Sequence, residues 1–334
     1  MDKTNWFDAK WENSRAQAAD KRRKKRILHS SPNSAEAIST DDEYAGIVAE
    51  TFGHGECTIL MEDTRIRTSK GIFNNLTVGD RVCVAKEDEG LVVSKVMPRR
   101  SKLVRMRFDA TRISDAGKEE HVLAANVDVA LIVASAISPR FTSRLVDRYL
   151  IACQYGQISS AICVTKIDLT PNVPDLSDYT QLGVKVFFVD GRDSSGVSEL
   201  RDFLTGKIAV LVGKSGVGKS TICNSLVGDD KQRVGEVSEH GGRGRHTTSN
   251  SSLIQLNNGG IIIDTPGIRA LGLWDIATDD LRFYFPEFTS WSPTCKFRDC
   301  RHLSEAECGV KDAVESGHLS KARYESYVRL ASQC

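Results

Sequence analysis

The sequence predicts a multidomain chain: an N-terminal β-barrel of the OB-like type, a central α/β domain with a parallel sheet, and a small helical, metal-binding C-terminal domain. Three observations predict this fold class. Residues 44–97 contain short β-rich runs between turn residues, residues 126–263 alternate apolar strands with helical stretches, and three cysteines and a histidine gather within 295–308. The expected boundaries are 1–43 for a basic, disordered arm, 44–105 for the barrel, 110–276 for the α/β domain and 277–334 for the C-terminal domain.

Composition narrows the class of protein. The chain has 45 basic and 44 acidic residues, so its net charge of +1 says nothing about the kind of partner it binds. No apolar run reaches the roughly 18 residues that span a bilayer, and residues 1–10 lack the apolar core of a secretory signal. Nine cysteines in such a chain favour free thiols or metal ligands over disulfides. We therefore expect a cytoplasmic protein without a membrane partner.

The N-terminal arm carries an unbroken run of six basic residues, 21–26, followed by a stretch rich in serine, proline and asparagine. Such a composition is typical of disorder. The run is either a solvated tail or an arm that seeks the phosphates of a nucleic acid, and the sequence leaves both interpretations open.

The barrel is predicted from four β-rich runs at 44–49, 57–61, 81–85 and 91–96, which glycine and asparagine turns separate. This pattern fits an OB-like barrel, and an SH3-like barrel fits it equally. Residues 98–107, which follow, include five basic residues and no acidic ones. A basic linker beside a barrel favours binding to nucleic acid.

The central domain is predicted from near-continuous apolar runs, which are typical of strands buried in a parallel sheet. These runs lie at 127–134, 160–164, 185–189, 208–212 and 261–263. Between these runs, residues 144–155 and 220–227 have apolar residues at helical spacing. Strands that alternate with helices predict a doubly wound α/β domain. A last helical stretch, 320–330, belongs to the C-terminal domain.

The most specific motif follows the strand at 208–212 and fits G-x-x-x-x-G-K-[ST]. It consists of Gly213, Lys214, Ser215, Gly216, Val217, Gly218, Lys219, Ser220 and Thr221. Glycines at this spacing let backbone N–H groups surround a polyphosphate. Lys219 is expected to reach the β- and γ-phosphates, and the Ser220 hydroxyl to bind Mg²⁺.

Two further strand ends carry motifs that complete a nucleotide site. Asp264, Thr265, Pro266 and Gly267 follow the strand at 261–263, where P-loop enzymes place an acidic contact to Mg²⁺. Thr165, Lys166, Ile167 and Asp168 follow the strand at 160–164 and match the guanine-reading element [NT]-K-x-D. A carboxylate there accepts hydrogen bonds from guanine and rejects adenine.

The order of the motifs is unusual, because the guanine element precedes the P-loop. Since the termini of compact domains lie at the surface, the same sheet can be built from a chain cut and rejoined elsewhere. The order therefore predicts a circularly permuted GTPase domain.

The catalytic residue is less evident from the sequence. The glycine-rich segment 240–249 suits a switch loop, in which Thr247 or Thr248 would contact Mg²⁺. Ile268 stands where Ras-like enzymes have a water-orienting glutamine. Either His246 performs this task or a partner completes the site, and slow intrinsic hydrolysis is expected.

The C-terminal cluster consists of Cys295, Cys300, His302 and Cys308. Three thiols and an imidazole suit one closed, tetrahedral, structural Zn²⁺ ion. The surrounding residues are too polar for the alternative, a set of buried free thiols.

Together these residues resemble the ribosome small-subunit-dependent GTPase A family, also called RsgA or YjeQ. Besides the motif order, the resemblance rests on the strings at 125–128, 147–150, 244–248, 285–288 and 295–300. It implies an OB-fold, a permuted GTPase domain and a zinc domain. It also implies GTP hydrolysis stimulated by the small (30S) ribosomal subunit, a role in late maturation of that subunit, and binding to its 16S rRNA. We expect a monomer.

The resemblance assigns the guanine element, the P-loop, the magnesium contacts and the zinc ligands to the residues named above. It leaves one departure: residues 189–191 are Val-Asp-Gly where a serine–alanine pair is usual. Two rival functions remain, another P-loop NTPase or a non-enzymatic RNA-binding scaffold in which GTP is structural.

Overall fold

The computed structural model describes residues 44–52, 55–87, 90–108, 118–190, 196–227, 252–264 and 278–332. It divides into two compact units. Within the described residues, the larger unit comprises 44–176 and 184–264, and the C-terminal unit comprises 177–183 and 278–332. The basic arm at 1–43 lies outside the described residues.

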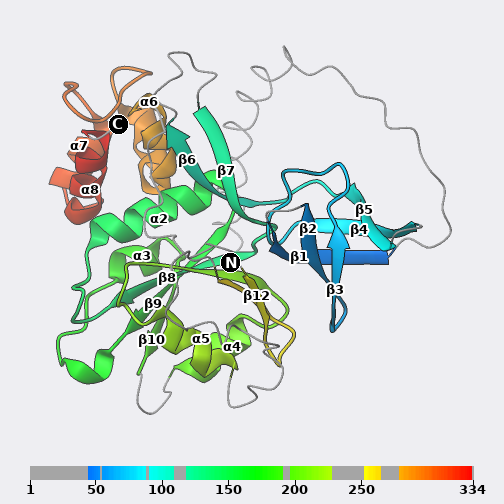
Figure 1. The fold of residues 1–334 in the computed structure, drawn as a ribbon. Helices are drawn as coiled ribbons and strands as arrows, with labels where there is room; N and C mark the ends of the chain where they lie inside the picture. Colours follow the sequence, from blue (N-terminus) through cyan, green and yellow to red (C-terminus); the bar gives the residue numbers. More distant parts are fainter. Residues whose placement is uncertain are drawn as a thin grey trace, which may run out of the picture. The chain divides into compact units, whose positions relative to one another are not determined.

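A closed barrel of five strands forms the first part of the larger unit, in the order β1-β2-β3-β5-β4 (Figure 1). The pairs are antiparallel except for β3 and β5, which run parallel, and this order is that of an OB-type barrel. Alternate side chains such as Val48, Ile59, Val82 and Val93 fill its interior. The strands are β1 (Tyr44–Thr51), β2 (Glu56–Met61), β3 (Thr64–Ser69), β4 (Arg81–Glu87) and β5 (Gly90–Val96).

Strand β3 is the barrel strand that the sequence did not reveal. Its residues Thr-Arg-Ile-Arg-Thr-Ser lack the apolar alternation of the other four. It pairs through its backbone with β2 and β5, and Arg67 and Arg65 form solvent-accessible ion pairs with Glu56 of β2 and Glu50 of β1. Cross-strand partners therefore determine β3 more than its own composition does.

The basic linker after the barrel is largely structured. Strand β6 (Lys102–Phe108) pairs antiparallel with β7 (Lys118–Ala125). Arg99 donates through Nε and a terminal nitrogen to the Asp80 carboxylate, at 2.7 and 2.8 Å, and Asp80 is fully buried. Arg100 pairs with Asp128 at 3.3 Å. Arg99 and Arg100, two of the five basic residues on which the prediction of nucleic-acid binding rested, therefore have acidic partners within the chain.

The junction between barrel and sheet is a tight backbone contact. Gly79 has a φ of 91°, and a Cβ there would lie 2.1 Å from the carbonyl oxygen of Ala125, so only glycine fits. The buried Asn126 side chain donates to the Gly79 carbonyl at 2.9 Å and accepts from the Arg100 N–H at 2.9 Å. These bonds satisfy polar groups that burial would otherwise leave unpaired.

The predicted α/β domain is confirmed as a six-stranded sheet in the order β10-β9-β8-β11-β13-β12. All neighbours run parallel except β12, which pairs antiparallel with β13. The strands are β8 (Val129–Ser135), β9 (Ser159–Thr165), β10 (Lys185–Val189), β11 (Ile208–Val212), β12 (Ser252–Gln255) and β13 (Ile261–Asp264).

Helices cover both faces of this sheet, as a doubly wound domain requires. Helices α4 (Val197–Phe203) and α5 (Lys219–Val227) pack on one face, where Leu131, Leu200 and Ile222 share a core. Helix α2 (Ser143–Tyr155) lies on the other face, with Val146 and Ile151 buried (Figure 1). Both ends of the parallel strands thus stay open for loops.

The C-terminal unit is built from short helices around an aromatic core. The rings of Phe285, Phe288 and Tyr327 lie 5.0–5.3 Å apart. Arg323 forms a buried ion pair with Glu287 at 2.8 Å. The elements are α3 (Ser177–Gln181), α6 (Thr278–Leu281), η3 (Arg282–Tyr284), η4 (Pro286–Ser290), η5 (Ser292–Thr294), α7 (Gly309–Glu315) and α8 (Lys321–Ala331). Among the described residues, no helix is long and apolar enough to cross a membrane.

Candidate nucleotide and metal sites

Three of the predicted motifs meet at the carboxyl edge of the parallel sheet. Thr165 is the last residue of β9, Gly213 follows β11 directly, and Asp264 is the last residue of β13. Parallel strands end at one edge, and ligands of open α/β sheets bind there. The sheet therefore places the guanine element, the P-loop and the acidic residue beside one another, although the chain visits them in a permuted order.

The P-loop has the backbone that a phosphate cradle needs. Gly213, Gly216 and Gly218 have φ values of 149°, 80° and 97°, which side chains disfavour. At Gly213 a Cβ would lie 2.3 Å from the Val133 carbonyl oxygen. Helix α5 begins at Lys219, directly after the loop. The loop thus leads into a helix N-terminus, whose N–H groups attract anions.

Lys219 folds back over the loop in this structure. Its Nζ donates to the carbonyls of Gly213 and Lys214, at 2.8 and 2.7 Å. The ammonium is therefore held at the mouth of the loop, where a bound polyphosphate would meet it.

Asp264 has an electrostatic link to the same lysine. Partial burial raises the pKa of the Asp264 carboxyl, and the Lys219 ammonium lowers that pKa in part. A carboxylate beside the P-loop lysine is a suitable oxygen donor for a hard divalent cation.

The guanine element is bonded directly to the P-loop. The Thr165 side chain is buried, and its hydroxyl donates to the Val217 carbonyl at 2.6 Å; the Ala134 carbonyl lies 3.2 Å away. Lys166, in the left-handed conformation at φ 59°, donates from Nζ to the Gly216 carbonyl at 2.8 Å. Asp168 lies in the 3₁₀ turn η2 (Ile167–Leu169) that follows. Base-reading and phosphate-binding segments therefore form one bonded assembly.

One supporting residue was missed from the sequence. Tyr149 of α2 is buried, and the backbone N–H of Gly213 is close enough to its hydroxyl to lower the pKa of the phenol in part. Burial is the main reason that the pKa of Tyr149 is raised. From the sequence, a tyrosine on an amphipathic helix is predicted to be a core residue. No local pattern indicates that its hydroxyl faces the P-loop.

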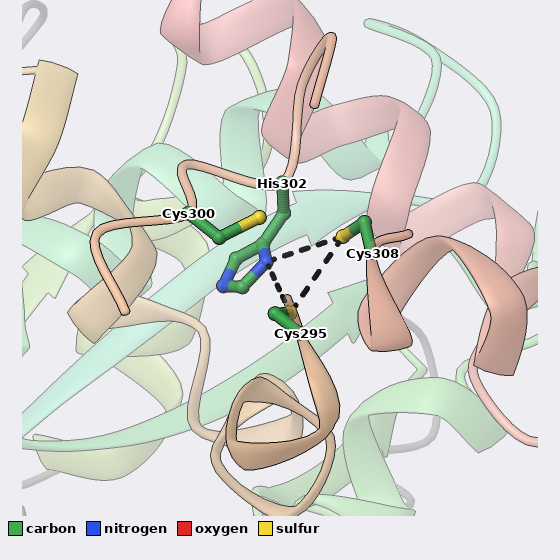
Figure 2. A group of neighbouring side chains, drawn as sticks. All are labelled: Cys295, Cys300, His302 and Cys308. Atoms are coloured by element: carbon green, nitrogen blue, oxygen red, sulfur yellow. Dashed lines mark hydrogen bonds between the residues drawn. The ribbon is translucent and has the colours of Figure 1, made fainter. Parts of the chain in front are cut away.

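The four residues of the C-terminal cluster converge, and their ligand atoms all lie within 4.8 Å of one another (Figure 2). The Sγ atoms of Cys295 and Cys308 are 3.9 Å apart, and the His302 Nδ1 lies 3.5 and 3.4 Å from them. Tetrahedral Zn²⁺ with bonds of about 2.3 Å to sulfur and about 2.0 Å to nitrogen implies S–S and S–N edges of about 3.8 and 3.5 Å. The donor set therefore fits zinc in chemistry and in size.

A serine hydroxyl orients the imidazole of His302 through the ring nitrogen that does not face the thiols. Its Nε2 lies 3.2 Å from the Ser292 hydroxyl, which donates to the Phe288 carbonyl at 2.9 Å. Burial is the main cause that lowers the pKa of His302 to about 4, so the ring is neutral and Nδ1 can coordinate. Ser292 was not foreseen, because a serine ten residues before a histidine is no recognisable signal.

Four predicted site residues lie outside the described residues: His246, Thr247, Thr248 and Gly267. Their roles stay predictions.

Comparison with known proteins points to one family. Residues 96–274 match the model of the RsgA GTPase family. The chain is 42% identical over 266 residues to a small ribosomal subunit biogenesis GTPase RsgA of Chlorobaculum tepidum, covering 77% of this chain and 85% of that protein. It is 35% identical over 303 residues to the protein so named in Sodalis glossinidius, covering 85% and 84%.

Solved structures show the same fold. YjeQ from Thermotoga maritima has a TM-score of 0.66 and 28% identity, covering 87% of this chain and 98% of that one. YloQ, described as a circularly permuted GTPase, also has a TM-score of 0.66 and 28% identity, covering 90% and 97%. The predicted relationship is confirmed: this chain belongs to the RsgA family of circularly permuted GTPases.

Proposed function

We propose that this GTPase acts in the late maturation of the small (30S) ribosomal subunit, and that the subunit stimulates its GTP hydrolysis. The observation that supports the proposal most is the bonded assembly of guanine element and P-loop, in which Thr165 and Lys166 donate to Val217 and Gly216. Because the guanine element is hydrogen-bonded to the P-loop, recognition of the base and binding of the phosphates are coupled. Relatives named small ribosomal subunit biogenesis GTPases supply the partner.

The nucleotide site is assigned as follows. Asp168 reads the guanine edge, with Thr165, Lys166 and Ile167 forming its turn. The P-loop from Gly213 to Thr221 holds the phosphates, with Lys219 contacting the β- and γ-phosphates. Mg²⁺, which neutralises charge developing on those phosphates, is held by Ser220 and Asp264, with Thr247 or Thr248.

Binding of the triphosphate requires Lys219 to exchange partners. Its ammonium would leave the carbonyls of Gly213 and Lys214 for phosphate oxygens, a charge-assisted and therefore stronger contact. The same exchange places the cation where negative charge develops in the transition state.

Hydrolysis needs an oriented water, and Ile268 has no group to orient one. We assign this task to His246 within a site that the ribosomal subunit completes. The intrinsic rate of the isolated protein is then slow, because the catalytic arrangement is incomplete without the partner.

The C-terminal cluster is assigned one structural Zn²⁺ held by Cys295, Cys300, His302 and Cys308. With four protein ligands no position is open for substrate, so the ion stabilises the fold of this unit. The protein is proposed to act as a cytoplasmic monomer that binds 16S rRNA.

The test is GTP turnover by the purified protein with and without small ribosomal subunits, with ATP as the competing nucleotide. We expect a slow basal rate, stimulation of at least tenfold by subunits, and no inhibition by ATP. The matched control is large ribosomal subunits at equal RNA concentration. Equal stimulation by both subunits would disprove the assigned partner, and zero turnover under all conditions would favour the scaffold in which GTP is structural.

A further inference from the structure

A basic cleft lies at the edge of the sheet opposite the nucleotide site. Its volume is about 550 Å³, and its lining includes Val129 and Ser159, the first residues of β8 and β9, and Lys207, which precedes β11. The motifs of the nucleotide site follow the carboxyl ends of these same parallel strands. The cleft is therefore a separate site, and none of its lining residues belongs to the P-loop or the guanine element.

The charged lining residues of the cleft are three cations and one carboxylate: Arg81, Arg100, Lys207 and Asp128. The carboxylate is already engaged, because its Oδ2 accepts from the Ile208 N–H at 2.9 Å and its Oδ1 from Arg100 at 3.3 Å. Arg81 is exposed at the start of β4, and within the described part of the chain the structure gives its side chain no acidic partner. Among the described lining residues, Arg81 thus lacks a counter-charge, whereas Lys207 donates from Nζ to the Phe203 carbonyl and is attracted by the Asp128 carboxylate.

A fourth cation adds to this field. The Nζ atoms of Lys207 and Lys185 lie 3.9 and 5.0 Å from the ring centre of Phe203, so both ammonium groups stack on one ring. Burial, and next the charge of Lys185, lower the pKa of Lys207, and the Asp128 carboxylate raises it in part. Because the two ammonium groups repel each other, an anion beside them would be favourable.

We propose that the cleft formed by Arg81, Lys207 and their neighbours binds the phosphate backbone of RNA in the small ribosomal subunit. The proposal rests on the function proposed above. The chemistry of the cleft suits phosphate groups: a guanidinium forks onto phosphate oxygens, an ammonium binds them as a point charge, and Phe203 offers half-buried apolar surface. Because a net charge of +1 supplies little general attraction to RNA, binding depends on local basic surfaces, of which this cleft is one.

The test compares two double variants that each remove two positive charges. The cleft variant is Arg81→Gln with Lys207→Gln. The control is Lys86→Gln with Lys95→Gln, because these lysines are exposed on β4 and β5 of the same barrel and do not line the cleft. Binding to small ribosomal subunits and to a short mixed-sequence RNA is measured from low to high salt. Thermal midpoints and GTP affinity check that both variants are folded.

We expect the cleft variant to bind subunits at least tenfold more weakly, with GTP affinity unchanged. Its log–log salt slope should fall by about 1.4, the value for two lost phosphate contacts, and the control should resemble the parent protein. Equal losses in both variants, or no loss in the cleft variant, would overturn the proposal. If the parent binds the short RNA through the cleft but never binds subunits, the cleft stands and the proposed function fails; if it binds neither, the cleft proposal fails too.

Discussion

The Thr165 hydroxyl and the Val217 carbonyl oxygen, 52 positions apart in the chain, lie 2.6 Å apart in the structure. This hydrogen bond connects the end of β9 to the middle of the P-loop, and both partners are buried. Common GTPases have an asparagine where this chain has Thr165. The bond shows that a threonine hydroxyl is long enough to reach the loop here.

Replacing Thr165 with valine keeps the shape of the side chain and removes its donor. The Val217 carbonyl would then be buried without this partner, at a cost of about 1–3 kcal/mol. We expect Thr165→Val to weaken GTP binding by about tenfold, and Thr165→Ser to stay close to the parent. Titration with a fluorescent GTP analogue measures both. An unchanged affinity for Thr165→Val would show that the bond does not support the nucleotide site.

Asp168→Asn should change base preference rather than abolish binding. The carboxylate is complementary to the N1–H and amino groups of guanine, whereas an amide can also donate to the second carbonyl of xanthine. We expect GTP affinity to fall about 100-fold or more and XTP to become the better ligand. Competition between GTP, XTP and ATP on the purified variant measures this. A parallel loss of all three nucleotides would instead indicate a folding defect.

Arg99 should contribute to stability and not to RNA binding. It bonds through two nitrogens to the fully buried Asp80, and the side-chain hydrogen bond to Asp80 is the main cause that raises the pKa of Arg99. Removing one partner of such a pair leaves an uncompensated buried charge, which costs about 3–5 kcal/mol. We expect Arg99→Met to lower the free energy of unfolding by that order in denaturant titrations. The exposed Arg81→Gln is the matched control and should stay within about 0.5 kcal/mol of the parent.

Ser292→Ala should weaken metal binding without removing a ligand. The Ser292 hydroxyl holds His302 Nε2 at 3.2 Å and thereby directs Nδ1 toward the three thiols. Loss of such an orienting group typically costs 10–100-fold in metal affinity. Competition with a chromophoric zinc chelator measures the change. Ser316→Ala, an exposed serine of the same unit, is the control and should not alter the affinity.

Removal of the metal should unfold the C-terminal unit and leave the larger unit folded. The cluster connects η5, the loop before α7 and the segment between them, which contain few apolar residues of their own. We expect one zinc per chain by elemental analysis. After chelation we expect the near-ultraviolet circular dichroism from packed aromatic residues such as Tyr324 and Tyr327 to decrease, and the affinity for GTP to be retained. Equal protease resistance of the C-terminal unit with and without chelator would argue against a structural ion.

The regular parts of the fold were accessible from the sequence, because their signals are local. The runs at 185–189 and 208–212 became β10 and β11 with the same limits, since continuous apolar residues are stable only inside a covered parallel sheet. Strand β3 was missed, because its sequence has no apolar alternation, and its place in the barrel follows from backbone pairing with β2 and β5. Strand β12 is too short to show a period.

The sequence by itself determined the chemistry available to this protein: a P-loop, a guanine-reading element in permuted order, and four zinc-type ligands in one short segment. In each of these motifs, the residue types and their spacing are enough to predict the ligand. Only the tertiary structure decided which groups meet. It showed that Thr165 reaches Val217, that Arg99 is committed to Asp80, and that Arg81 and Lys207 line one cleft. The physical reason is that such contacts join distant parts of the chain, and their existence depends on how strands are ordered and packed.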